Sequence, residues 1–154
     1  GRQFKEDLIS PLEYRDLLLQ IDQKYNELKE RGFKTHFGRK ENLWTLLYYE
    51  LGRFTPLRDK KTIFGGCAIG INLLVIGADG TVYPCRRLPI KIGKVPEEKI
   101  KDIFIYSEEL NNLRELEKME KCKECPLFQY CRGCPAVAYA YTGNYFAPDP
   151  QCWR

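Results

Sequence analysis

The sequence of 154 residues has no apolar run near the roughly 20 residues that a helix needs to cross a bilayer, so no membrane-spanning segment is predicted. It also has no internal repeat and no low-complexity tract. Its single histidine, His36, lies in a loop rich in glycine, lysine and arginine, which favours a surface position. No Ser-His-Asp, Cys-His or paired-carboxylate arrangement is visible, and we predict no catalytic residue.

A strong excess of one charge is absent as well. Lys and Arg outnumber Asp and Glu by 25 to 21, and the net charge of +4 is spread along the chain. Nucleic-acid-binding proteins carry a basic stripe on one element, so no nucleic-acid partner is expected here. An apolar fraction of 44% and an aromatic fraction of 13% exclude a disordered chain.

Cysteine is absent from the first 66 residues and then occurs seven times. An odd number of cysteines cannot pair completely into disulfides, and closely spaced Cys-x-x-Cys repeats are poor disulfide frameworks. Metal or cluster ligation in a reducing compartment fits better, so we predict a cytoplasmic protein. The cysteines are Cys67, Cys85, Cys122, Cys125, Cys131, Cys134 and Cys152.

Sequence patterns predict an α+β fold in which helices come first. The segment Ser10–Glu13 forms a capping box with proline at the first helical position, which predicts a long helix over about 11–31. The dipeptide Asp79-Gly80 predicts a β-hairpin between two apolar runs. The other expected elements are a helix over 40–51, a linker over 53–66, strands over 71–76 and 81–83, a loop over 86–95, short helices over 96–104 and 107–120, an irregular segment over 122–134 and a helix over 135–142.

The spacing of the cysteines limits what they can bind. The first two are arranged as Cys67-x12-Gly80-x4-Cys85, the next four as C-x2-C-x5-C-x2-C over residues 122–134, and Cys152 comes last. Soft thiolates select zinc or iron–sulfur clusters. Five residues between two Cys-x-x-Cys pairs are a tight fit for one tetrahedral zinc, whereas seven thiolates divide naturally into four and three. On spacing alone, both metals remain open.

This order of cysteines resembles the SPASM domain, the C-terminal auxiliary-cluster domain of radical S-adenosylmethionine (radical SAM) enzymes. Cys67, Gly80 and Cys85 match the first block of its motif, residues 122–131 match most of the second, and Cys152 matches the last cysteine. The second block ends with two intervening residues where the general motif has three. This shorter form is similar to a subgroup that includes haem-pathway and some peptide-modifying members.

The resemblance implies two auxiliary [4Fe–4S] clusters held by interleaved sets of cysteines. The first would have a fourth position that is open or filled by another group, and the second would be held by four cysteines. The shortened loop leaves a single auxiliary cluster as an alternative. The implied ligands are Cys67, Cys85 and Cys134 for the first cluster, and Cys122, Cys125, Cys131 and Cys152 for the second.

The barrel that cleaves S-adenosylmethionine in this family carries a CxxxCxxC motif, which this sequence lacks. We therefore expect residues 1–61 to be a helical lead-in or linker from a barrel that is missing from this chain. Residues 62–154 would form the SPASM-like cluster domain. S-adenosylmethionine and a third cluster would belong to the missing barrel, so the chain alone would lack the cleavage site.

The resemblance implies electron transfer, substrate binding, or both, in the modification of a peptide or cofactor precursor. The implied partners are the radical SAM barrel of the same enzyme, the peptide or cofactor-precursor substrate, and an electron donor or acceptor such as ferredoxin or flavodoxin. The alternative is a zinc-stapled module that binds a protein or nucleic acid.

Charged residues near the cysteines have two interpretations. Arg86, Arg87 and Arg132 either offset the negative charge of clusters or are solvated loop arginines. Asp149 is expected to be the turn residue of a Pro-Asp-Pro segment, with oxygen ligand or hydrogen-bond acceptor near Cys152 as the alternatives.

Overall fold

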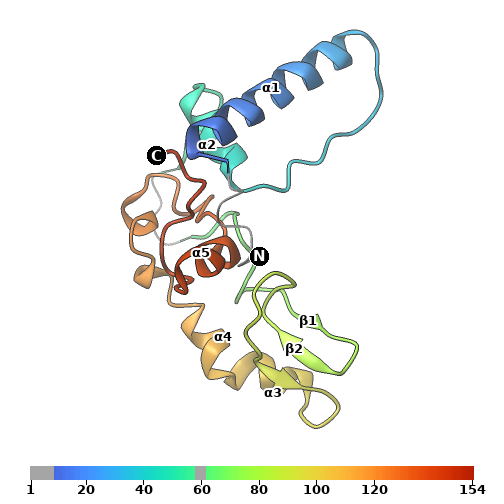
Figure 1. Ribbon diagram of the computed structural model, residues 1–154, viewed down its shortest axis with the longest axis vertical. Coiled ribbons are helices and arrows are strands. Elements are labelled where there is room, and N and C mark those ends of the chain that lie inside the picture. The colour runs from blue at the N-terminus through green and yellow to red at the C-terminus, as the bar shows by residue number, and fades with distance from the viewer. Residues whose placement is uncertain (1–8, 58–61) are drawn as a thin grey trace.

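The computed structural model describes residues 9–57 and 62–154. Helices come first, followed by a three-stranded antiparallel sheet and further short helices, which confirms the predicted α+β class. Figure 1 shows an elongated arrangement, with two N-terminal helices at one end, the sheet at the other and the cysteine-rich segments between them. None of the helices in these two ranges is long and apolar enough to cross a bilayer.

Helix α1 (Pro11–Glu30) begins at the predicted capping box. The hydroxyl of Ser10 accepts the N–H of Glu13 at 3.3 Å, and the Glu13 carboxylate accepts the N–H of Ser10 at 2.8 Å. Two of the amide groups left unpaired at a helix start are thereby satisfied, and Pro11 supplies a helical φ angle. The predicted helix start is confirmed.

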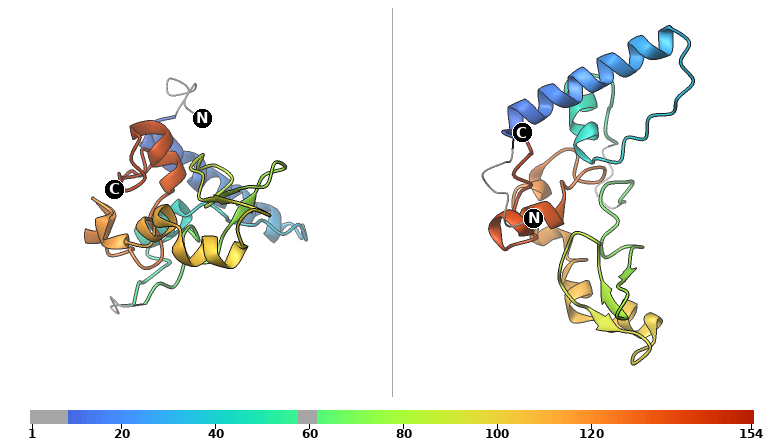
Figure 2. Two further views of the ribbon diagram at one scale, coloured as in Figure 1. Left: turned by 90° about the horizontal axis from the view of Figure 1, so that it is seen from below. Right: turned by 45° about the vertical axis from the view of Figure 1, so that its right-hand side comes forward.

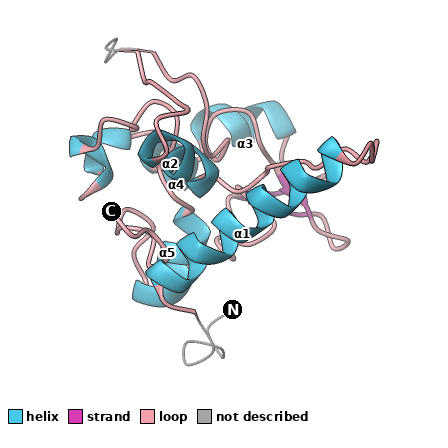
Figure 3. Ribbon diagram, turned by 90° about the horizontal axis from the view of Figure 1, so that it is seen from above, coloured by secondary structure: helices cyan, strands magenta, loops and turns pink. Residues whose placement is uncertain are grey.

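Helix α2 (Leu43–Glu50) is shorter than the helix predicted over 40–51. Its N-cap is Asn42, whose side-chain amide donates to the carbonyl oxygen of Gly133 at 2.7 Å. The helix therefore starts where the chain is tied to the cysteine-rich segment. Helices α1 and α2 pack against each other at one end of the molecule (Figure 1 and Figure 3).

The first apolar core joins these helices to the cysteine-rich segment. Leu47 is fully buried between the helices, and Leu127, from the loop between two cysteines, is 1% exposed in the same core. Cys125, Cys131 and Cys152 pack against the edge of this core. The other buried members are Leu18, Leu43, Trp44 and Leu46.

A buried carboxylate, Asp22, links α1 to the segments on either side of α2. It accepts hydrogen bonds from the hydroxyl of Tyr48 at 2.7 Å, from Arg53 at 2.6 Å and from Arg39 at 3.2 Å. Burial raises the pKa of Asp22, but these hydrogen bonds outweigh it and hold the pKa below its ordinary value. Asp22 is therefore ionised and paired at neutral pH.

Strands β1 (Val75–Ile76) and β2 (Thr81–Tyr83) form the hairpin predicted from Asp79-Gly80. The strand predicted over 71–76 is too long, because the N–H groups of Ile71 and Asn72 both donate to the carbonyl of Ala68 in a turn. Only the last two residues of that apolar run pair with β2, through Val75 opposite Tyr83 and Ile76 opposite Val82.

A third strand, β3 (Gly93–Lys94), lies within the segment predicted to be a loop, so that prediction is wrong at this point. It pairs antiparallel with β2, and the N–H of Ile92 extends the pairing by donating to the carbonyl of Val82 at 2.9 Å. Gly93 lies directly against Ile103, where a Cβ atom would be 2.6 Å from that side chain. Close packing on a helix explains the glycine in this strand.

Helices α3 (Ile100–Tyr106) and α4 (Glu108–Asn112) follow the sheet and lie beside it at the end of the molecule opposite α1 (Figure 2). Both predicted helices in this region are displaced, since α3 starts at 100 rather than 96 and α4 ends at 112 rather than 120. A short 3-10 helix, Leu116–Lys118, follows α4. The predicted cap is confirmed, because the Ser107 hydroxyl accepts the N–H of Leu110.

The second apolar core lies between the sheet, these helices and α5 (Pro135–Thr142). The last helix has its predicted bounds, with proline at its start and Gly143 at its end in the left-handed conformation at φ 82°. Cys67 and Cys85 pack against this core, and Cys134 belongs to it. Its other buried members are Ile69, Val82, Leu88, Ile92, Ile103, Leu110, Leu113 and Ala136.

Gly80 holds β2 close to the chain after β3. Its φ angle is +82°, and a Cβ atom at this position would collide with the carbonyl oxygen of Val95. The backbone carbonyl of Gly80 in turn accepts the N–H of Val95 at 2.9 Å. Strand β2 is followed by Pro84 and Cys85. By fixing the position of β2, this glycine also fixes the position of Cys85.

Replacing Asp22 by alanine should lower the free energy of unfolding by about 2–3 kcal/mol, because its carboxylate loses four hydrogen bonds, the three above and one from the amide of Asn26 at 3.3 Å. Asp16→Ala is the matched control, since Asp16 pairs with Arg15 but is 61% exposed, and it should change stability by no more than about 0.5 kcal/mol. Urea unfolding measures both. Equal effects of the two substitutions would show that the Asp22 hydrogen bonds add no stability.

The same carboxylate should make stability depend on pH in the acid range. A pKa held below the unfolded value of about 3.9 gives stability that is present above that pH and is lost as the pH falls through the folded pKa. Urea midpoints between pH 6 and roughly pH 3 should therefore fall more steeply for the parent chain than for Asp22→Ala. Parallel curves would contradict this assignment.

Gly80→Ala should lower the free energy of unfolding by about 2–4 kcal/mol, from an unfavourable φ angle plus a backbone collision. Gly52→Ala separates the two effects, because Gly52 has a φ of +68° but nothing within 4 Å of the added Cβ atom. We expect a loss of only about 1 kcal/mol from that control. If both substitutions shifted the urea midpoint equally, the close approach of Val95 would be of no energetic consequence.

Candidate functional site

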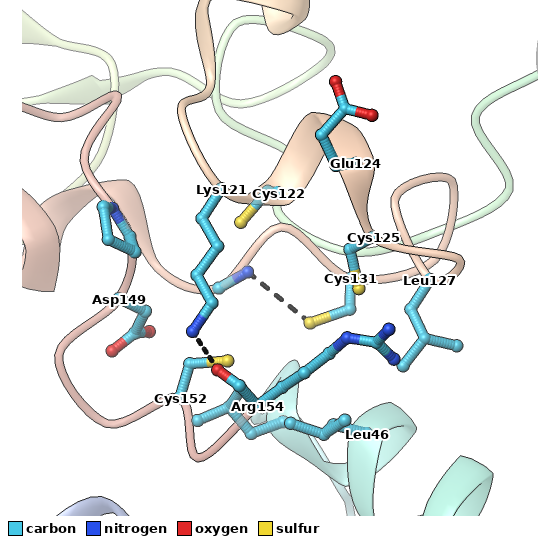
Figure 4. Close-up of a pocket in the computed structure, with 13 residues that line it drawn as sticks. Leu46, Lys121, Cys122, Glu124, Cys125, Leu127, Cys131, Asp149, Cys152 and Arg154 are labelled. Atoms are coloured by element: carbon cyan, nitrogen blue, oxygen red, sulfur yellow. Dashed lines mark hydrogen bonds between the residues drawn. The ribbon is translucent and has the colours of Figure 1, made fainter.

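Four of the seven cysteines line one cavity of about 200 Å³. They are Cys122, Cys125, Cys131 and Cys152, and Figure 4 shows their sulfur atoms facing the same space. Apolar side chains of Leu43, Leu46 and Leu127 form part of its lining. We call this group of residues the four-thiol site.

Three segments bring these thiols together. Cys122 opens a short 3-10 helix, Cys122–Glu124, and the N–H of Cys125 closes that turn by donating to the carbonyl of Cys122 at 2.9 Å. The N–H of Cys131 donates to the carbonyl of Leu127 at 2.7 Å, so the chain turns back toward the cavity. The C-terminal tail supplies Cys152.

Helices α1 and α2 anchor that tail. The indole N–H of Trp153, next to Cys152, donates to the carboxylate of Glu50 at 3.0 Å. Arg15 holds the same carboxylate with hydrogen bonds of 2.6–3.0 Å, and these contacts lower the pKa of Glu50. The N-terminal helices therefore help to position the last cysteine of the four-thiol site.

The electrostatics of the four-thiol site favour a bound cationic group. Burial raises the pKa of Cys122 to about 11 and of Cys131 to about 12, with repulsion from the neighbouring thiolates adding to the effect. Burial also raises the pKa of Cys152. Four thiolates can coexist in this cavity only when a metal or cluster compensates their charge.

The remaining three cysteines, Cys67, Cys85 and Cys134, line a second cavity of about 310 Å³, which we call the three-thiol site. Cys134 stands at the start of α5 and Cys85 directly after β2, so the two elements meet at this cavity. Burial raises the pKa of Cys67 and of Cys134, and the nearby Arg87 partly offsets the effect for both. Lys40, Asn42, Arg86 and Arg87 line the same cavity.

The two cavities divide the cysteines in the same way as the ligand sets that the sequence resemblance implies. Ligation itself remains a prediction. No group of three or more His, Cys, Asp or Glu side chains in residues 9–57 and 62–154 is gathered closely enough to hold a single metal ion. All seven cysteines are free thiols.

A repeated backbone pattern prepares the thiols for ligation. Two cysteines accept a hydrogen bond at sulfur from the N–H two residues further along the chain, Cys85 from Arg87 and Cys131 from Gly133, each at 3.5 Å. Such N–H···S bonds stabilise thiolates and influence the reduction potentials of iron–sulfur clusters. At Cys67, Cys134 and Cys152, nearby backbone N–H groups lower the pKa of the thiol and partly oppose the larger rise caused by burial.

Arg132 is not a solvated loop arginine, and that interpretation of it is wrong. It is 4% exposed, and its guanidinium donates to the carbonyl oxygens of Phe128 at 3.0 Å, Gly65 at 2.9 Å and Cys67 at 3.1 Å. It thus ties the segment around Cys67 to the loop of the four-thiol site. The position of Arg132 between two cysteines was the only sequence feature that could have indicated its burial. Two of its carbonyl partners, Gly65 and Cys67, lie far from it in the sequence.

Asp149 is a turn residue, as predicted, because its carboxylate accepts the N–H of Gln151 at 2.9 Å. The carboxylate also accepts the N–H of Cys134 at 2.8 Å. That contact joins the tail to the three-thiol site, which sequence reasoning did not find. The hydrogen-bond role that was the alternative for Asp149 is thus present as well, but its carboxylate binds the backbone of Cys134 rather than that of Cys152.

Comparison with known proteins also indicates iron–sulfur cluster binding. Residues 67–135 match the SPASM family, described as an iron–sulfur cluster-binding domain. An AdoMet-dependent heme synthase of Methanosarcina barkeri is 35% identical over 88 residues, which are 56% of this chain and 25% of that protein. A heme synthase of the same description from Oleidesulfovibrio alaskensis is 32% identical over 88 residues, 56% of this chain and 23% of the relative.

A PqqA peptide cyclase of Methylocella silvestris is 32% identical over 101 residues, which are 62% of this chain and 26% of that protein. The chain thus spans about a quarter of the length of the curated relatives it matches. No solved structure matches it. The cysteine arrangement and the family match agree: residues 67–135 of this chain are similar to the SPASM family of iron–sulfur cluster-binding domains.

Proposed function

We propose that this chain is the C-terminal auxiliary-cluster part of a radical SAM enzyme that modifies a peptide or a cofactor precursor. The observation that carries the proposal is the division of seven cysteines between two cavities, four in one and three in the other. The names of the relatives support both substrate classes, since one is a peptide cyclase and the others are heme synthases.

The four-thiol site has the donor set for a fully ligated [4Fe–4S] cluster, with Cys122, Cys125, Cys131 and Cys152 as ligands. Such a cluster, when bound, supplies one-electron transfer. The residues of this chain place the four thiols around the cavity, and Leu43, Leu46 and Leu127 add apolar surface to its lining. The site is therefore suited to electron transfer rather than to substrate binding.

The three-thiol site offers only Cys67, Cys85 and Cys134, so a [4Fe–4S] cluster held there would keep one iron position for another ligand. Lys40, Arg86 and Arg87 are exposed and line the same cavity. Their charges offset the negative charge of a thiolate-bound cluster, which is one of the two roles predicted for the arginines. This site is the one at which substrate binding is proposed.

The size of the cavities favours clusters over zinc. A zinc ion binds four sulfur atoms at about 2.3 Å and needs no enclosed volume beyond its own. A cavity of about 200 Å³ has room for roughly six or seven water molecules, which is far more than one ion occupies. Its thiol lining suits a polynuclear group.

The remaining partners follow from this proposal. S-adenosylmethionine and a third cluster would bind in the radical SAM barrel of the same enzyme. Ferredoxin or flavodoxin would be the electron donor or acceptor of that enzyme. Residues 1–61 would lead from that barrel to the cluster domain. Seven free thiols support a reducing compartment, and we propose the cytoplasm.

Cys122→Ala should remove a ligand from the four-thiol site alone. Iron in the anaerobically reconstituted chain should then fall from about eight to about four atoms, while the spectrum of the other cluster is retained. Cys85→Ala should show the reverse pattern. Iron and sulfide analysis and EPR spectra of the reduced chain measure both losses.

Cys152→Ala is the matched test of the ligand sets, because Cys152 is distant from Cys122 in sequence but lines the same cavity. It should abolish the same EPR signal as Cys122→Ala. If it abolished the signal that Cys85→Ala removes, the ligand sets would have to be exchanged. Full iron content in all three variants would refute the proposed ligation.

A further inference from the structure

Asp149 lies where the four-thiol and three-thiol sites meet. It is 5% exposed and lines the four-thiol cavity, yet its carboxylate binds the backbone of a three-thiol cysteine. We infer that Asp149 is a positioning residue for both sites, which fixes them relative to each other and keeps a buried negative charge between them. This inference rests on the proposed function, because it treats both sites as cluster sites.

Three hydrogen bonds define the link. One carboxylate oxygen of Asp149, Oδ2, accepts the N–H of Cys134 at 2.8 Å, and the other, Oδ1, accepts the N–H of Gln151 at 2.9 Å. The backbone carbonyl of Asp149 accepts the N–H of Cys152 at 3.0 Å. A single residue therefore orients one cysteine from each site through its backbone.

Gly133 makes this close approach possible. Its φ angle is +59°, and a Cβ atom on it would lie 2.6 Å from the Cβ of Asp149. The N–H of Gly133 donates to the sulfur of Cys131 at 3.5 Å, while its carbonyl accepts the amide of Asn42 at 2.7 Å. The short loop between Cys131 and Cys134 is thus shaped to receive the carboxylate.

The charge of Asp149 has a consequence besides geometry. Burial raises the pKa of the Asp149 carboxyl, and the N–H groups of Gln151 and Cys134 oppose that rise by donating to its two oxygens, which is the hydrogen-bond pattern of an ionised carboxylate. A cluster becomes more negative when it is reduced, so a buried negative charge nearby opposes reduction and lowers the reduction potential. Because Asp149 borders both sites, it should lower the potentials of both clusters.

Asp149→Asn tests this inference, since it keeps the shape of the side chain and removes the charge. In the full chain, reconstituted without oxygen, EPR-monitored redox titration should show both midpoint potentials shifted to more positive values. Glu124→Gln is the matched control, because Glu124 also lines the four-thiol cavity but is exposed. Solvent screens that charge, so the control should shift the potentials much less.

The outcomes separate the inference from the proposed function. Unchanged potentials in Asp149→Asn, or shifts no larger than in Glu124→Gln, would overturn the inference while both clusters remain. If Asp149→Asn instead lost iron, loss from both sites would support the positioning role, and loss from one site only would overturn it. A parent chain that binds no iron would refute the proposed function itself.

Discussion

The gathering of seven thiols, one buried and six half-buried, in the middle of a small molecule is the constraint on which the rest of the structure depends. Buried thiolates repel one another and lose their hydration, so they need a compensating cationic group and fixed hydrogen-bond donors. The chain provides donors from its own backbone, as in the N–H of Gly133 directed at Cys131. Each surrounding element then serves to hold a cysteine-bearing segment in place.

The segment that carries four of these cysteines has little regular structure to support it. Between Cys122 and Cys134 only a single 3-10 turn is present, so the stability of this loop comes from contacts with distant residues. Leu127 anchors it in the helical core, and buried Arg132 binds the carbonyl of Cys67. Asp149 binds it from the tail side. The loop is thus fixed by side chains rather than by a sheet or helix of its own.

The N-terminal helices are part of the same arrangement, although they contain no cysteine. Arg15 in α1 holds Glu50 in α2, and Glu50 receives the indole N–H of Trp153. The C-terminus accordingly lies beside the start of α1 (Figure 1 and Figure 2). The four-thiol site is completed by residues from both ends of the chain.

Features that depend on neighbouring residues could be predicted from the sequence, and features that depend on distant contacts could not. The capping box at Ser10 and the Asp79-Gly80 turn satisfy their hydrogen bonds locally, so their patterns were sufficient. Strand β3 contains only Gly93 and Lys94, and it exists because β2 pairs with it. Its two residues have no apolar alternation that could have revealed it.

The same distinction between local features and distant contacts applies to the candidate site. The cysteine spacing carried the family resemblance and the expected cluster chemistry, because ligand spacing is a local property of the sequence. The burial of Arg132 and the contact between Asp149 and Cys134 arise only when separate segments fold together. Loop residues of this kind carry no periodic signal, so their partners could not be inferred.

The most direct test of the account is the metal content of the chain purified without oxygen. Iron, acid-labile sulfide and zinc should be measured per chain together with the visible spectrum. Two [4Fe–4S] clusters predict about eight iron and about eight sulfide per chain and a brown colour. About one or two zinc ions per chain, with no visible absorption, would contradict the account.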